Sequence, residues 1–211
     1  MTPMYNIIFL QIGKCFRRII VKRGLDMAES TKIRIAESLK ELLARKPLEK
    51  LTVSDISNNC GVNRQTFYYY FHDVYDLIEW ILLSEGRKLF SDRRNRESWQ
   101  DGFLEIFSAM KENSIFVRQT YRSHARENLE KILLEGAETI ILQILATEEI
   151  PLSREDAAFI AGFYKHAFAG IVLDWIGSDM KGDPAVIVKK VEMVMASSLS
   201  ENLRRFSVNA I

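Results

Sequence analysis

The chain has 211 residues, enough for one or two domains that each bury a core. Hydrophobic residues make up 47% and charged residues 27% of it, which is a globular composition and excludes a disordered tail. The formal net charge of +1 argues mildly against nucleic-acid binding, although the distribution of charge decides more than its sum. Two cysteines, Cys15 and Cys60, suggest no disulfide framework, and this fits a cytoplasmic protein.

Residues 1–26 allow two interpretations. Their apolar run over residues 7–12 is too short to span a bilayer. Basic residues follow this run instead of preceding it as in a signal peptide, so we expect neither a targeting nor a membrane segment. Met27 immediately precedes the stretch AESTKIRIAESLKELL, in which a first helix is predicted. Residues 1–26 are therefore either a translated upstream segment or a basic arm that adds phosphate or minor-groove contacts.

A first helix is predicted from Ser30 to Arg45. Within it Ile35, Leu39 and further leucines recur at helical spacing, with Lys and Glu between them. Pro47 stops this helix, because proline cannot continue the helical hydrogen bonding.

The stretch from Leu51 to Asp73, LTVSDISNNCGVNRQTFYYYFHD, is predicted to form two short helices joined by a tight turn. Thr52 followed three residues on by Asp55 has the spacing of a capping box, which starts the first of them. Gly61 follows its end. Asn63 is a good N-cap for the second helix, whose first turn is polar and whose body is aromatic. This arrangement is a helix-turn-helix.

The second of these helices is predicted to have two different faces. At 100° per residue, Phe67 and Phe71 share one face, whereas Gln65, Tyr68 and Tyr69 lie on the opposite one. In a helix-turn-helix the start of the second helix enters the major groove, where Gln pairs with adenine and Arg with guanine. The sequence therefore predicts binding to double-stranded DNA through Thr52, Asn63, Arg64, Gln65, Thr66, Tyr68, Tyr69 and His72.

The run GVNRQTFYYYFHDVYDL, from Gly61 to Leu77, resembles the recognition-helix signature of the tetracycline-repressor (TetR) family of bacterial one-component regulators. The resemblance extends over about Glu29 to Leu77. Val74 stands where many members carry a lysine that grips a phosphate, and His72 stands where another basic residue is common. The resemblance thus implies fewer phosphate contacts at this point.

The rest of the chain is predicted to be helical. Asp73 caps a fourth helix that runs through Leu89, and by the resemblance it links the DNA-binding and ligand domains. The charged stretch Ser91 to Glu97 is the expected loop between domains. The fold class is then all-α, with a helix-turn-helix domain over residues 27–73 and an effector-binding and dimerisation domain over 74–211. Its further helices are expected at about Trp99 to Glu112, Ile115 to Arg122, Ala125 to Ala146, Arg154 to Gly177, and from Pro184 onward.

The segment Arg154 to Gly177 is apolar nearly all round. A helix without a polar face must be buried on more than one side, so we expect a partner chain to cover one of them. The resemblance implies a homodimer whose two terminal helices pair as a four-helix bundle. The stretch Gly162 to Pro184 also resembles the C-terminal domain of a subgroup that includes activators of dihydroxyacetone kinase operons. The predicted interface residues are Gly162, His166, Ala169, Gly170, Leu173, Val191, Met195 and Leu199.

The sequence contains no nucleophile elbow, metal-ligand spacing or phosphate-binding glycine loop. We therefore expect no enzyme activity, no cofactor and no metal site. By resemblance an effector pocket lies among the C-terminal helices, and side chains there could line it or orient a ligand. The candidates are Phe107, Arg118, Arg122, His124, Phe163 and His166.

The predicted function is a cytoplasmic, homodimeric transcriptional regulator that binds a palindromic operator under control of a small-molecule or protein effector. Repression and activation are both open at this point. The alternative is a helical interaction or adaptor protein that has lost DNA binding, an alternative that Val74 and the near-neutral charge support.

Overall fold

The computed structural model describes residues 28–91, 98–147 and 152–208, and the predicted all-α fold is confirmed throughout them. Residues 1–26 and 92–97, on which two predictions depend, lie outside this part. The chain is helical over residues 28–43. The elements that follow are η1 (Leu48–Lys50), α2 (Val53–Cys60), α3 (Arg64–Tyr70), α4 (Val74–Ser91), α5 (Trp99–Glu112), α6 (Ser114–Tyr121), α7 (Arg126–Thr147), α8 (Arg154–Gly177) and α9 (Pro184–Val208).

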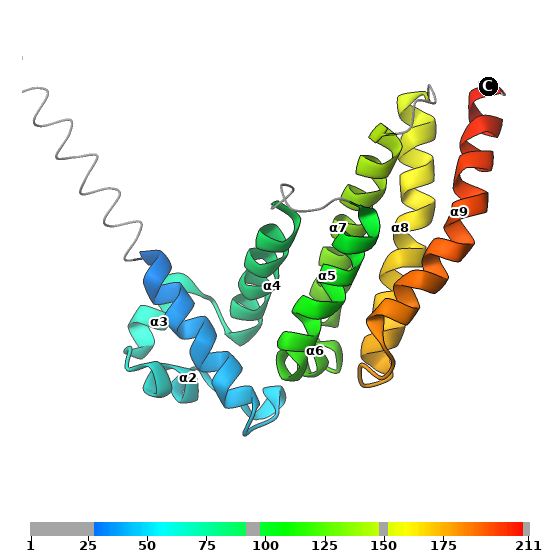
Figure 1. Cartoon of the computed structure of the whole chain (residues 1–211). Helices are drawn as coiled ribbons and strands as arrows, with labels where there is room; N and C mark the ends of the chain where they lie inside the picture. The colour runs from blue at the N-terminus through cyan, green and yellow to red at the C-terminus, as the bar shows by residue number, and fades with distance from the viewer. Residues whose placement is uncertain (1–27, 92–97, 148–151, 209–211) are drawn as a thin grey trace, which may run out of the picture.

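Figure 1 shows the helix over residues 28–43 with α2 and α3 at one end of the molecule, and α8 and α9 at the opposite edge. Helix α4 starts directly after α3 and packs on α7, so it joins the two parts. Helix α8 packs mainly on α7, and α9 packs on α5. Helices α4 to α7 therefore lie between α8 and α9 on one side and the first helix, α2 and α3 on the other.

Side-chain caps start most of the helices where the sequence predicts. Asn63 accepts a hydrogen bond from the backbone N–H of Thr66, and Ser153 accepts one from Asp156. Asp73 accepts two, from the backbone N–H groups of Tyr75 and Asp76. Each cap satisfies donors that have no partner inside the helix. Thr52 and Ser98 cap α2 and α5 in the same way.

The first helix ends two residues before the predicted Arg45. Residue 47 is a proline, so no N–H is present to bond the carbonyl of Leu43 four residues back. Instead the backbone N–H groups of Arg45 and Lys46 both bond Leu42, which closes the last turn. The prediction ended the helix at Arg45, two residues before the proline, whereas the missing donor takes effect earlier still, at Leu43.

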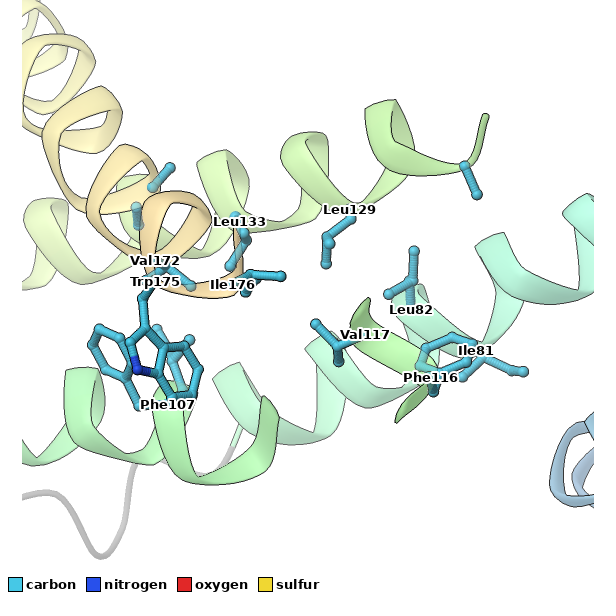
Figure 2. Close-up of a cluster of buried hydrophobic side chains, with 14 of the residues drawn as sticks. Ile81, Leu82, Phe107, Phe116, Val117, Leu129, Leu133, Val172, Trp175 and Ile176 are labelled. Atoms are coloured by element: carbon cyan, nitrogen blue, oxygen red, sulfur yellow. The ribbon is translucent and has the colours of Figure 1, made fainter. Parts of the chain in front are cut away.

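The main core lies between α5, α7 and α8 and is rich in aromatic rings. Phe103 packs against Phe168 in a tilted arrangement with ring centroids 4.7 Å apart, and Phe107 meets Trp175 edge to face at 4.9 Å. Figure 2 shows Phe107 and Trp175 at one end of this cluster, with aliphatic side chains from α4, α6 and α7 continuing it. Such pairs stabilise beyond the apolar area that they bury.

Helix α8 keeps a large apolar surface outside this core. By length and composition it is the one helix among the described residues that could cross a membrane, and 28% of the apolar window is buried inside the chain. Phe159 and Phe163 remain 66% and 68% exposed. Exposed apolar area of this kind on a monomer marks an interaction surface.

Candidate DNA-binding site

The start of α2 is fixed by a reciprocal cap. The Thr52 hydroxyl accepts from the Asp55 backbone N–H at 3.2 Å, and the Asp55 carboxylate accepts from the Thr52 backbone N–H at 2.9 Å. Lys46 donates to the same carboxylate at 2.8 Å. The Lys46 hydrogen bond and those of Thr52 lower the pKa of Asp55 from 3.8 to about 2. The predicted capping box is thus confirmed, and Lys46 adds to it an ion pair that the sequence did not indicate.

The turn between α2 and α3 depends on Gly61. Its φ is 67°, in the left-handed region that glycine adopts without strain. The Gly61 N–H bonds the carbonyl of Asn58, and the Val62 N–H bonds that of Ser57 at 3.0 Å. This pair of bonds is a Schellman motif, which satisfies the last carbonyls of α2 while it turns the chain into α3.

Helix α3 has the two faces that the sequence predicts. Phe67 is fully buried, and Phe71, which follows the helix, is 2% exposed. Tyr68 and Tyr69 are 51% and 80% exposed, and Arg64 and Gln65 also face solvent. The buried rings anchor the helix, so its polar first turn is presented on a fixed support.

Four of the predicted DNA contacts already have partners within the chain. The carboxamide oxygen of Asn63 accepts from both the backbone N–H and the hydroxyl of Thr66, at 2.6 and 3.0 Å. The Thr52 hydroxyl donates to Asp55, and the backbone N–H of His72 donates to Asp76 at 2.7 Å. Of the eight, Thr66 is half-buried and the others are exposed. These caps do not involve four of the exposed side chains, which are those of Arg64, Gln65, Tyr68 and Tyr69.

Polar side chains that sequence reasoning missed hold α2 against the first helix. Arg34 donates to the carbonyl of Cys60 at 2.7 Å, and buried Ser38 donates to that of Ile56 at 2.9 Å. Asn59 donates to Ser38 and to Glu41. Of these residues only Ser38 is buried, as a polar residue on the core-facing side of its helix, and the others are exposed and carry no such sequence signal. They fix the angle between the first helix and the turn.

Val74, the departure from the family pattern, begins α4 and packs against the core. This residue therefore has a packing role in place of the phosphate contact that a lysine would make.

A cavity of about 290 Å³ lies between α4, α5, α6 and α7, and Lys40 of the first helix reaches its wall. The wall is mainly aliphatic and aromatic, and Figure 2 shows Leu82, Phe116, Val117 and Leu129 around this region. Its apolar lining includes Leu82, Ile106, Met110, Phe116, Val117 and Leu129.

None of the six predicted effector residues lines this cavity. Phe107 packs on Trp175, and Arg122 forms an ion pair with Asp179 at 2.6 Å. Arg118 donates to the carbonyl of Ser114 in its own helix at 3.2 Å. The remaining three residues, His124, Phe163 and His166, are exposed. The prediction selected polar and aromatic residues, whereas the cavity is lined by side chains that look like ordinary core.

The predicted interface residues differ in their burial. Ala169, Val191 and Met195 are buried inside the chain, so their side chains are not available to a partner. On a helix that is apolar all round, the sequence does not show which stripe faces the core. His166 is exposed, and its ring Nδ1 lies 2.8 Å from the carbonyl of Gly162. The half-buried residues are Gly162, Gly170 and Leu173, and the side chain of Leu199 lies outside the described part.

None of the exposed apolar residues of α8 and α9 was among the predicted interface residues. Phe159 and Phe163 lie on α8, and Val186, Met193 and Val194 lie on α9. The rings of Phe159 and Phe206 lie 6.2 Å apart, which joins the outer faces of the two helices. We call these residues the α8/α9 edge.

The fold and the site define a class of protein: a helix-turn-helix module joined by α4 to a larger all-helical region. Two family descriptions match the chain, "Bacterial regulatory proteins, tetR family" over residues 35–79 and "Transcriptional regulator C-terminal region" over residues 97–197. The chain belongs to the TetR family of bacterial transcriptional regulators, which are not enzymes.

Similar proteins agree with this assignment. The chain is 28% identical over 115 residues to the dhaKLM operon transcriptional activator DhaS of Lactococcus lactis, covering 54% of this chain and 60% of DhaS. It is 23% identical over 175 residues to the uncharacterized regulator YxbF of Bacillus subtilis, covering 78% of this chain and 44% of YxbF. The chain therefore spans less than two thirds of these curated relatives.

Solved structures share the fold. A dihydroxyacetone kinase operon activator DhaS superposes with a TM-score of 0.67 at 22% identity, over 84% of this chain and 98% of that one. The fatty acid degradation regulator FadR from Bacillus halodurans gives 0.56 at 18% identity, over 80% and 95%.

Proposed function

We propose that the chain is a cytoplasmic, homodimeric regulator that binds two operator half-sites through α3, under control of an effector. The observation that carries this proposal is the presentation of α3: its polar first turn faces solvent while Phe67 and Phe71 are buried beneath it. We assign DNA binding to a domain over residues 27–73, and effector binding and dimerisation to residues 74–211.

The structure supports separate roles for the exposed residues. Arg64 and Gln65 have flexible polar ends in the first turn of α3, where base edges of the major groove are reached. Thr52 and Thr66 are engaged in caps, and Tyr68 stands further along the helix. Gln65 and Arg64 therefore carry base readout, whereas Thr52, Thr66 and Tyr68 hold the DNA backbone.

A second copy of this chain covers the α8/α9 edge. Two exposed phenylalanines on α8 and two valines and a methionine on α9 form an apolar surface that water would otherwise face. A two-fold dimer built there presents two copies of α3, one for each half-site. The geometry requires the two helices about 34–36 Å apart, or an operator that bends to fit.

The cavity between α4 and α7 is the effector site. Its volume of about 290 Å³ is roughly twice that of the apolar cavity, on the order of 150 Å³, that binds benzene in an engineered protein. A mainly apolar molecule of about a dozen non-hydrogen atoms fits such a space.

To test DNA binding, duplexes are selected from a random pool with the full chain and compared with unselected DNA by electrophoretic shift. Gln65→Ala is expected to cost about 1–3 kcal/mol on the selected duplex and little on unselected DNA. Gln100→Ala is the matched control, because Gln100 lies on α5, bonds Glu192 of α9 and has no part in α3. Failure to enrich any duplex contradicts the proposal and favours an adaptor.

A further inference from the structure

Two backbone groups between the first helix and α2 lack partners in their own elements. The carbonyl of Leu43 has no helical donor, because the residue four positions on is Pro47. The N–H of Leu48 begins the short helix η1, where no preceding turn supplies an acceptor. Leu43 and Leu48 are both buried, so solvent does not readily satisfy these groups.

Gln119 of α6 satisfies both groups with one side chain. Its carboxamide nitrogen donates to the Leu43 carbonyl at 2.8 Å, and its carboxamide oxygen accepts from the Leu48 N–H at 2.8 Å. A carboxamide carries a donor and an acceptor together, and only one of its two orientations satisfies both backbone groups. We call these two bonds the Gln119 clamp. It ties α6 to the DNA-binding helices.

Helix α6, which carries Gln119, also forms part of the cavity wall. Phe116 and Val117 of α6 line the cavity and precede Gln119 by less than one turn. Figure 2 shows them opposite Leu82 of α4. Because α6 is a single eight-residue helix, a displacement of its cavity side moves the clamp with it. The cavity and the clamp are thus two sides of one rigid element.

We propose that Gln119 is the positioning residue that transmits occupancy of the cavity to the helix-turn-helix, by setting where residues 43–48 lie. This inference rests on the proposed function and adds a route separate from the covalent link through α4. A clamp with a purely structural role would hold the fold without coupling the cavity to DNA binding. Coupling is therefore the quantity to measure.

The clamp itself is tested by hydrogen exchange on the full chain. Gln119→Met keeps the length of the side chain but removes both bonds, whereas Gln119→Glu keeps an acceptor for the Leu48 N–H and loses the donor. We expect the Leu48 amide to exchange at least tenfold faster in Gln119→Met and to stay protected in Gln119→Glu. The Leu51 amide, which donates to the Leu48 carbonyl at the end of η1, is the internal reference. Equal Leu48 protection in wild type and Gln119→Met overturns the clamp.

The coupling is tested by filling the cavity in two independent ways. Ala109→Leu adds three carbons to a residue of the wall, and benzene serves as a diffusible occupant. For each, the dissociation constant of a selected duplex is measured with and without filling. We expect a change of at least fivefold when Gln119 is present, within the usual range of allosteric coupling, and less than twofold in Gln119→Met. Gln100→Met, which breaks a bond between α5 and α9, is expected to keep the wild-type ratio.

The outcomes separate the two levels of the argument. If cavity filling changes the dissociation constant equally in wild type and in Gln119→Met, the clamp is a structural contact only and the inference is overturned. The absence of any change in wild type overturns it as well. DNA binding by α3 stands in both cases. A wild-type chain that selects no duplex overturns the proposed function and with it the inference. Thermal unfolding of each variant establishes that the compared chains are folded.

Discussion

The turn at Gly61 allows a backbone effect to be isolated from packing. A Cβ built at Gly61 meets no atom within 4 Å, so Gly61→Ala introduces no clash. The residue has φ 67°, and a side chain in this left-handed region costs about 1–2 kcal/mol. For a chain of this size each kcal/mol lowers the Tm by roughly 2–4 °C, so the expected fall is about 2–8 °C.

Gly61→Asn is the matched control for this prediction. Asn is larger than Ala but tolerates the left-handed region better, because its side chain bonds locally. Both variants and the wild type are unfolded thermally and in urea at one protomer concentration, since a dimer's stability depends on concentration. We expect Ala to be less stable than Asn. If Asn costs as much as Ala or more, side-chain volume rather than backbone conformation limits the turn, and the reasoning fails.

Three further predictions concern the caps, the edge and the operator. The pKa of Asp55 is about 2 in the folded chain against 3.8 ordinarily, so its stabilisation is present above pH 3.8 and is lost as the pH falls towards 2. The Tm difference between wild type and Asp55→Asn is expected to disappear over that interval, and a constant difference would contradict the ion-pair account. Phe163→Glu on the α8/α9 edge is expected to give monomers in sedimentation with less than about 0.5 kcal/mol lost from the protomer, whereas Ile33→Glu, at another exposed apolar site on the first helix, leaves dimers; monomeric wild type refutes the dimer. Tyr68→Phe is expected to weaken selected and unselected DNA alike, so a loss confined to the selected duplex would instead make the Tyr68 hydroxyl a base reader.

The helix-turn-helix was predictable because its determinants are local. Capping side chains act three residues along the chain, and the turn needs one residue with positive φ. Asn63, Gly61 and the alternation around Phe67 therefore give the element bounds and the two faces of α3 directly. The structure places each of them as the sequence predicts.

The cavity was not predictable, because a cavity is defined by missing atoms among elements far apart in the chain. Leu82, Met110 and Leu129 have the spacing of ordinary core residues, and the sequence does not show that their side chains leave space between them. Helix α8 poses a related difficulty. Its residues are apolar on every side, so Ala169 and Phe163 look equivalent until the packing on α7 separates a buried stripe from an exposed one.

The Gln119 clamp lies beyond local reasoning for a third reason. Pro47 predicts that a carbonyl of the first helix lacks its backbone donor, but it does not predict which group donates instead. That donor, Gln119, is 76 residues from Leu43. A side chain on α6 that bonds backbone can bond any sequence at those positions. Nothing in the residues it contacts therefore identifies it.

Proline at position 47 has a consequence for how such chains diverge. While it stays, a residue at position 119 that offers both a donor and an acceptor is required, and glutamine is the side chain that reaches with both. Once another residue replaces it, the chain regains an N–H at position 47 that can close the first helix on Leu43, and half of the requirement on position 119 is lifted. Among descendants of one ancestor the two positions are thus expected to change in order, first the proline and then the glutamine, so that lineages with the proline but without the glutamine are rare.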